Sequence, residues 1–241
     1  MAAAVFAAVF LLGAPMHPVR RLIHDRRSLV SLGAGMSAAY VFVHVMPELH
    51  GARTVVAESV REARFEGMGT YFLALVGFLV FYGLQHLGRL AREPREATET
   101  GPAPEGGSAA YRLHLGGFAV YVCLMGYLLV HGFEETSVST LLFAVAIAFH
   151  FLSVDNSLRG EYGAAYERRG RYLLAAMAPV GWVLGLAVSL SPFALALMVA
   201  FISGAVIVNS AVMELADEKD GRLLPFLIGG LLYGLILLPL A

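Results

Sequence analysis

Histidine, acidic and amide side chains recur inside the apolar stretches of this 241-residue chain. His44 and Glu48 have an i,i+4 spacing, which puts an imidazole and a carboxylate on one face of a helix. His131 is followed at i+3 and i+4 by Glu134 and Glu135, so these three side chains also share a face. Imidazole nitrogens and carboxylate oxygens are ligands for first-row divalent cations. Both clusters are therefore candidate cation sites, with a solvated helix end as the alternative.

Two further clusters lie deeper in apolar sequence. His150 sits well inside one apolar run, and Asp155 is turned about 140° away from it at 100° per residue. Asn209 is expected within the bilayer and Glu214 near its inner surface. An ionisable group inside a membrane costs several kcal/mol unless it has a partner, so each is a functional candidate by default. The alternatives are a structural histidine at His150 and a solvated acidic end at Glu214.

Composition places these clusters in a membrane protein. The chain is 58% hydrophobic and only 15% charged, with a mean hydropathy of +0.71, whereas soluble domains carry about 25% charged residues. The net charge of −1 predicts no nucleic-acid partner, since no basic patch is evident. Cys123 is the single cysteine, which excludes a disulfide within the chain. His86 and His114 lie near helix ends, where we expect them to be interfacial.

The sequence predicts an all-α, polytopic helix bundle that forms a single transmembrane domain, 1–241. A span needs about 20 mostly apolar residues, and about eight segments fit this template. They are 2–16, 28–49, 68–91, 111–133, 137–158, 171–190, 193–215 and 222–240. Pro192 predicts a break between the sixth and seventh spans. The Pro-, Gly- and Glu-containing stretch 92–109 is predicted to be a flexible cytoplasmic linker.

The basic residues predict the orientation of these spans. Most of the 17 Lys and Arg residues fall in the segments after the first, third, fifth and seventh spans. Positive charge is retained on the cytoplasmic side of a membrane. We therefore expect both termini outside, in a protein of the cell (inner) membrane.

Three stretches of the chain resemble the Zrt/Irt-like (ZIP) family of metal transporters. Residues 31–52 are rich in Gly and Ala and close on His44, Pro47 and Glu48, similar to that family's second helix. Residues 175–192 resemble its sixth helix, which contains Pro and Gly. Residues 203–238 resemble its last two helices, which are joined by an acidic segment. The resemblance implies an eight-span bundle that transports zinc, iron or manganese, with two helix groups rocking about a central site.

The resemblance also implies roles for single residues. His131, Glu134, Glu135, His150 and Asp155 would be the metal ligands. His44 and Glu48 would form the outer entrance, and Asn209 and Glu214 would line the exit. The metal ion is then a substrate, no cofactor is expected, and the partners are the lipid bilayer and the cation, with a homodimer as a further option.

Two positions depart from the family's ligand pattern and leave other functions open. Gly132 stands where the family has an amide ligand, and Phe151 stands where it has a carboxylate. A second hypothesis is therefore a pseudo-transporter, in which the fold serves as a membrane scaffold or regulator. A third is a metal-dependent intramembrane hydrolase, which requires His44, His131 and His150 to converge at one depth. Because we expect these histidines at different depths, we predict that the protein is not an enzyme.

Overall fold

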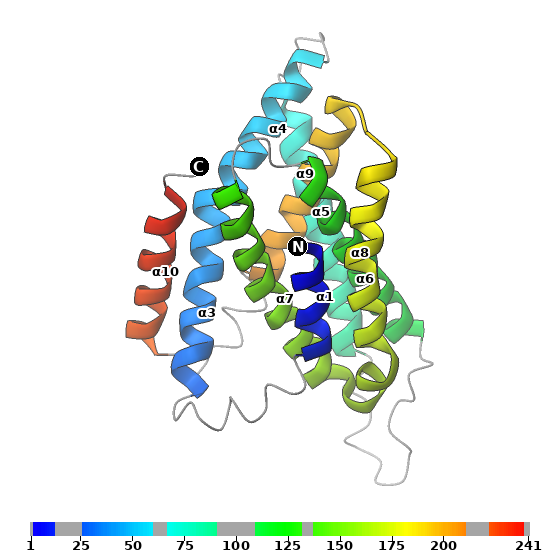
Figure 1. Ribbon diagram of the computed structural model, residues 1–241, viewed down its shortest axis with the longest axis vertical. Helices are drawn as coiled ribbons and strands as arrows, with labels where there is room; N and C mark the ends of the chain where they lie inside the picture. The colour runs from blue at the N-terminus through cyan, green and yellow to red at the C-terminus, as the bar shows by residue number, and fades with distance from the viewer. Residues whose placement is uncertain are drawn as a thin grey trace.

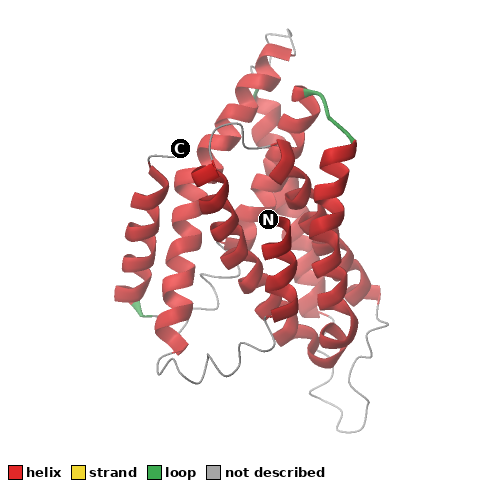
Figure 2. Ribbon diagram, in the orientation of Figure 1, coloured by secondary structure: helices red, strands yellow, loops and turns green. Residues whose placement is uncertain are grey.

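A computed structural model describes residues 2–12, 26–59, 67–90, 109–131, 137–210 and 222–238. Every element in these ranges is helical, which confirms the predicted all-α class (Figure 2). The helices pack as an elongated bundle (Figure 1). They are α1 (Ala2–Leu12), α3 (Arg26–Tyr40), the π-helix η1 (Val41–Val45), α4 (Met46–Ser59), α5 (Met68–Leu90), α6 (Ala109–His131), α7 (Ser137–Ala165), the π-helix η3 (Tyr166–Gly170), α8 (Arg171–Ala187), α9 (Pro192–Val208) and α10 (Leu223–Leu237).

The second predicted span runs farther than expected, because Pro47 does not end the helix. A proline inside a helix removes one hydrogen bond and its ring clashes with the carbonyl four residues earlier. The wide π-helical turn η1 lies directly before Pro47 and accommodates this clash. Helix α4 then continues to Ser59, ten residues beyond the predicted end of the span.

The predicted connection 159–170, between the fifth and sixth spans, is mostly helical, with a break at Gly163. Helix α7 continues to Ala165, and η3 joins it directly to α8. Gly163 bends the path, with φ 48 and ψ −123, a backbone conformation that a residue without Cβ adopts readily. The predicted break at Pro192 is confirmed: Val188 is extended, and the Ser191 hydroxyl accepts from the Ala194 amide to cap α9. The predicted linker lies outside the described residues, except for Ala109 at the start of α6.

Three helix pairs form the densest interfaces: α3 with α10, α5 with α9, and α6 with α8. Each helix contributes a glycine at which a Cβ would overlap a backbone carbonyl oxygen of its partner. These glycines are Gly35 and Gly229, Gly77 and Gly204, and Gly126 and Gly181. Small residues of this kind let helix backbones approach closely in membrane proteins.

The two helices of each pair run parallel. Along α3 and α10, Leu32 lies against Gly229 and Ala39 against Gly234, so the contacts advance in the same direction on both helices. Helices α5 with α9 and α6 with α8 follow the same rule. Figure 1 shows α10 beside α3 at the edge of the bundle.

Most basic residues of the described elements gather at one end of the bundle. We call this the basic end; it holds the starts of α3, α6, α8 and α10, the end of α5, and η3. The positions there are Arg26, Arg27, Arg89, Arg112, Arg168, Arg169, Arg171 and Arg222. Near the opposite end, α4 carries Arg53.

The exterior of the bundle is apolar. Among the described residues, three stretches are long and apolar enough to cross a membrane, namely Met68–Gly88, Ala109–His131 and His150–Ala187. Helices α9 and α10 are shorter apolar helices, and leucines cover the outer face of α10. Apart from the arginines at the basic end, few charged side chains are exposed on these surfaces, which supports association with a membrane.

Candidate functional site

A line of polar side chains runs between α3–η1–α4 and α9. Ser37, Tyr40, His44 and Glu48 follow one another at intervals of three or four residues along the first of these helices. Helix α9 contributes Ser203, and Ser210 follows two residues after its end, seven residues from Ser203. We call these six residues the polar seam. The hydroxyls of Ser37 and Ser210 are 2.8 Å apart, which closes one end of the seam with a hydrogen bond.

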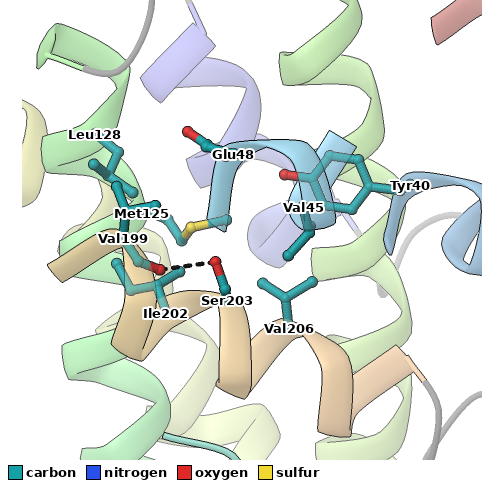
Figure 3. Close-up of a pocket in the computed structure, with 9 residues that line it drawn as sticks. All are labelled: Tyr40, Val45, Glu48, Met125, Leu128, Val199, Ile202, Ser203 and Val206. Carbon is teal, nitrogen blue, oxygen red and sulfur yellow. Dashed lines mark hydrogen bonds between the residues drawn. The ribbon is translucent and has the colours of Figure 1, made fainter. Parts of the chain in front are cut away.

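Glu48 lies at the other end of the polar seam, in a small pocket between α4, α6 and α9 (Figure 3). The Tyr40 hydroxyl points towards the same space. Ser203 also lines the pocket and donates to the Val199 carbonyl at 2.8 Å, so its oxygen can still accept a hydrogen bond. The remaining lining is apolar: Val45, Met125, Leu128, Val199, Ile202 and Val206. Among the described residues that line this pocket, Glu48 is thus the only acidic one, and the other walls are hydroxyl, thioether or hydrocarbon.

His44 accompanies Glu48, as the i,i+4 spacing predicted. Its Nε2 is 3.7 Å from Glu48 Oε2, and its ring stacks on Tyr40 with centroids 5.2 Å apart. The side chain of Glu48 is 30% exposed and that of His44 is 18% exposed. The two side chains are thus partly exposed, whereas His44 Nε2 itself is buried. The pair carries both a nitrogen and oxygen donors.

A buried amide pair lies beside the Ser210 end of the polar seam. Gln85 of α5 donates its Nε2 hydrogen to Asn209 Oδ1, and both residues are buried. Gln85 Oε1 and Asn209 Nδ2 have no hydrogen-bond partner among the described residues. A buried polar atom without a partner costs about 1–3 kcal/mol, so the pair has capacity for a further polar contact. Asn209 was predicted from the sequence, whereas Gln85 was missed although it is an amide within an apolar run.

The structure separates two of the predicted metal ligands, His131 and His150. His131 ends α6 and donates its Nε2 hydrogen to the Gly185 carbonyl at 2.8 Å. His150 is buried, and its Nε2 is hydrogen-bonded to the hydroxyl of Tyr121 at 3.1 Å. Tyr121 and His131 are ten residues apart on α6, a rise of about 15 Å. The two imidazoles therefore lie at different depths of the bundle.

Asp155, the third predicted ligand, is held in an ion-pair network. Its Oδ2 accepts from Arg159 at 2.9 Å and its Oδ1 accepts from the Tyr166 hydroxyl at 2.7 Å. Arg159 also pairs with Glu167, which is 3.5 Å from Arg171. The two acids and two arginines balance in charge and join α7, η3 and α8. Asp155 is only 2% exposed, and both of its oxygens are used within this network.

We expect Asp155→Asn to destabilise the protein by about 2 kcal/mol, because an amide cannot accept from both Arg159 and Tyr166 as a carboxylate does. Thermal unfolding of the detergent-solubilised protein measures this as a lower midpoint. Asn156→Ala, an exposed neighbour on the same helix, is the matched control and should leave the midpoint unchanged. Equal midpoints for Asp155→Asn and the wild-type protein would show that the network adds no stability.

His114, which was predicted to be interfacial, lies near the start of α6 and is buried within the bundle. It is 1% exposed, with Nδ1 at 2.7 Å from the Tyr162 hydroxyl and 3.4 Å from Glu161 Oε2. Gly88 of α5 leaves the space that this ring fills. The buried position follows from the helical segment 159–170, which carries Glu161 and Tyr162 back against α6.

The predicted ligands thus form no common cluster in the described part of the chain. Glu134, Glu135 and Glu214 lie outside the described residues. Within those residues, no three His, Cys, Asp or Glu side chains are close enough together to hold a metal ion. Comparison with known proteins gave no matching family model, no matching curated protein and no matching solved structure. The polar seam, by contrast, brings His44 and Glu48 together.

Proposed function

We propose that the protein is a membrane transporter for divalent metal cations, zinc, iron or manganese, and that the polar seam is part of their path. The observation that carries this proposal is Glu48 with His44 beside it, at a pocket inside an otherwise apolar bundle. Keeping a carboxylate in such surroundings is costly, which favours a functional reason for it. Carboxylate, imidazole and hydroxyl groups together suit first-row cations.

The parallel pairing of the helices supports an eight-span topology. In a chain that crosses the membrane at every span, spans with both even or both odd numbers run in the same direction. The three pairs correspond to spans two and eight, three and seven, and four and six, so each pair meets this condition. The positive-inside rule then assigns the basic end to the cytoplasm of the cell (inner) membrane, with both termini outside.

The polar seam has the dimensions of half a membrane crossing. From Glu48 to Ser37 the helix rises about 16 Å, against a hydrocarbon core of about 30 Å. A cation taken up by Glu48 and His44 would pass the hydroxyls of Tyr40 and Ser203. It would then reach the Ser37–Ser210 hydrogen bond. This hydrogen bond must break for passage, so it acts as the inner closure.

The pseudo-transporter remains a second candidate because of one specific observation. His131, His150 and Asp155 have separate protein partners instead of a shared position. The histidines that a hydrolase would need, His44, His131 and His150, also lie on different helices. This separation disfavours the hydrolase, which needs converging histidines. We therefore keep the proposal that the protein is not an enzyme.

Uptake into proteoliposomes tests the transport proposal. Purified protein is reconstituted into vesicles that contain a metal-sensitive dye, and zinc, iron(II) and manganese are added in turn. We expect at least one metal to enter faster than into protein-free vesicles. If folded protein moves none of the three metals, the scaffold hypothesis replaces transport.

A further inference from the structure

Three arginines at the basic end have exposed side chains: Arg112 in the first turn of α6, and Arg168 and Arg169 in η3. None of them forms an ion pair with an acid among the described residues. The nearby acids are already engaged, since Glu167 pairs with Arg159 and Arg171, and Glu161 contacts His114. The three arginines therefore present uncompensated positive charge.

Packing holds the two arginine-bearing segments together. Tyr111, next to Arg112, donates its hydroxyl to the carbonyl of Ala165 at 3.2 Å. Gly170 lies against the same hydroxyl, and a Cβ there would come within 3.0 Å of it. The start of α6 and η3 are thus fixed side by side, and the arginines on them form one cationic rim.

Exposed apolar side chains border this rim directly. Leu113 follows Arg112 and is 55% exposed, while Tyr172 and Leu173 follow η3 and are 50% and 41% exposed. A surface that changes from arginine to leucine within one residue matches the boundary between lipid headgroups and acyl chains. Arginine also offers several N–H donors in a fork that suits phosphate oxygens.

We propose that Arg112, Arg168 and Arg169 form a binding site for the phosphate headgroup of an anionic phospholipid at the membrane surface. The adjoining leucines and Tyr172 contact the acyl chains, which is why a lipid is favoured over a soluble phosphate. This proposal requires only that the chain lies in a membrane; it does not depend on cation transport.

Thermal unfolding of the full-length protein in mixed micelles tests the site, because a ligand that binds the folded state raises the unfolding midpoint. Phosphatidylglycerol is compared with phosphatidylcholine of the same chains, and with inorganic phosphate. Phosphatidylglycerol should raise the midpoint of the wild-type protein, and the other two should not. Each of Arg112→Gln, Arg168→Gln and Arg169→Gln should weaken phosphatidylglycerol binding about fivefold, and the triple variant should lose most of the midpoint rise.

Arg53→Gln, in α4 near the opposite end, is the matched control and should keep the full midpoint rise. The single variants also keep the test decisive if the triple variant fails to fold, because each should still show its own loss. An unchanged rise in all single variants would overturn the proposal. So would an equal rise with inorganic phosphate, which would identify a site for a soluble anion. Metal uptake is not part of this measurement, so its result does not depend on whether the protein transports a metal.

Discussion

Metal uptake is expected to fall at least tenfold when Glu48 is replaced by glutamine. Even residues that only orient a metal ligand change metal affinity by about 10- to 100-fold when replaced, so removing the one acidic side chain at the pocket should have at least this effect. Glutamine keeps the size and one oxygen of the side chain, so the apolar walls of the pocket can stay in place. The loss should therefore appear in the initial rate of uptake and not in the amount of folded protein.

Glu58→Gln is the matched control for this experiment. Glu58 lies on the same helix, α4, but is exposed near its end and away from the polar seam. Both variants remove one negative charge, so only an effect of position can separate them. If a folded Glu48→Gln variant takes up metal at the wild-type rate, neither Glu48 nor the polar seam is part of the path.

The largest losses of stability are expected at the glycines of the three helix pairs. Gly35→Ala, Gly77→Ala and Gly126→Ala each introduce a Cβ that overlaps a backbone carbonyl of the partner helix. A backbone cannot rotate away as a side chain can, so the helices must separate. We expect each variant to lose about 3 kcal/mol, the upper part of the usual range for overpacking.

Three other glycines on the same helices serve as controls. Gly33, Gly83 and Gly116 have nothing within 4 Å of the position that a Cβ would take. Alanine at these sites should be neutral or stabilise by up to about 1 kcal/mol, because it favours helix. Unfolding midpoints of the six variants measure the difference. Similar midpoints for the two sets would mean that the close helix contacts are not what stabilises the bundle.

The sequence predicted those parts of the fold that depend on local composition. The predicted span 68–91 corresponds to α5, Met68–Leu90, because its apolar length alone defines it. Residues 159–170 were predicted to connect two spans, since five of them are charged and three are glycine. Their helical structure depends on Asp155, Arg159 and Glu167 pairing across the α7–α8 connection, and a single sequence does not reveal such pairing.

The site was predicted in part for a similar reason. His44, Glu48 and Asn209 stand out in apolar sequence because ionisable and amide groups are rare there. Ser37, Ser203 and Tyr40 do not, since hydroxyl side chains are common at membrane helix interfaces of every kind. What distinguishes these hydroxyls is that they face each other across α3–η1–α4 and α9, which follows from tertiary packing.

The three parallel pairs also have a consequence for how the chain is made. Along the sequence, α6 and α8 flank α7, α5 and α9 lie outside them, and α3 and α10 are outermost. During synthesis, α6 can meet α8 early, whereas the glycine face of α3 stays uncovered until α10 has been made. Helix α10 therefore completes the third pair. A chain that stops before Leu223 would keep its two inner pairs and leave its earliest-made partner, α3, as a target for quality-control proteases.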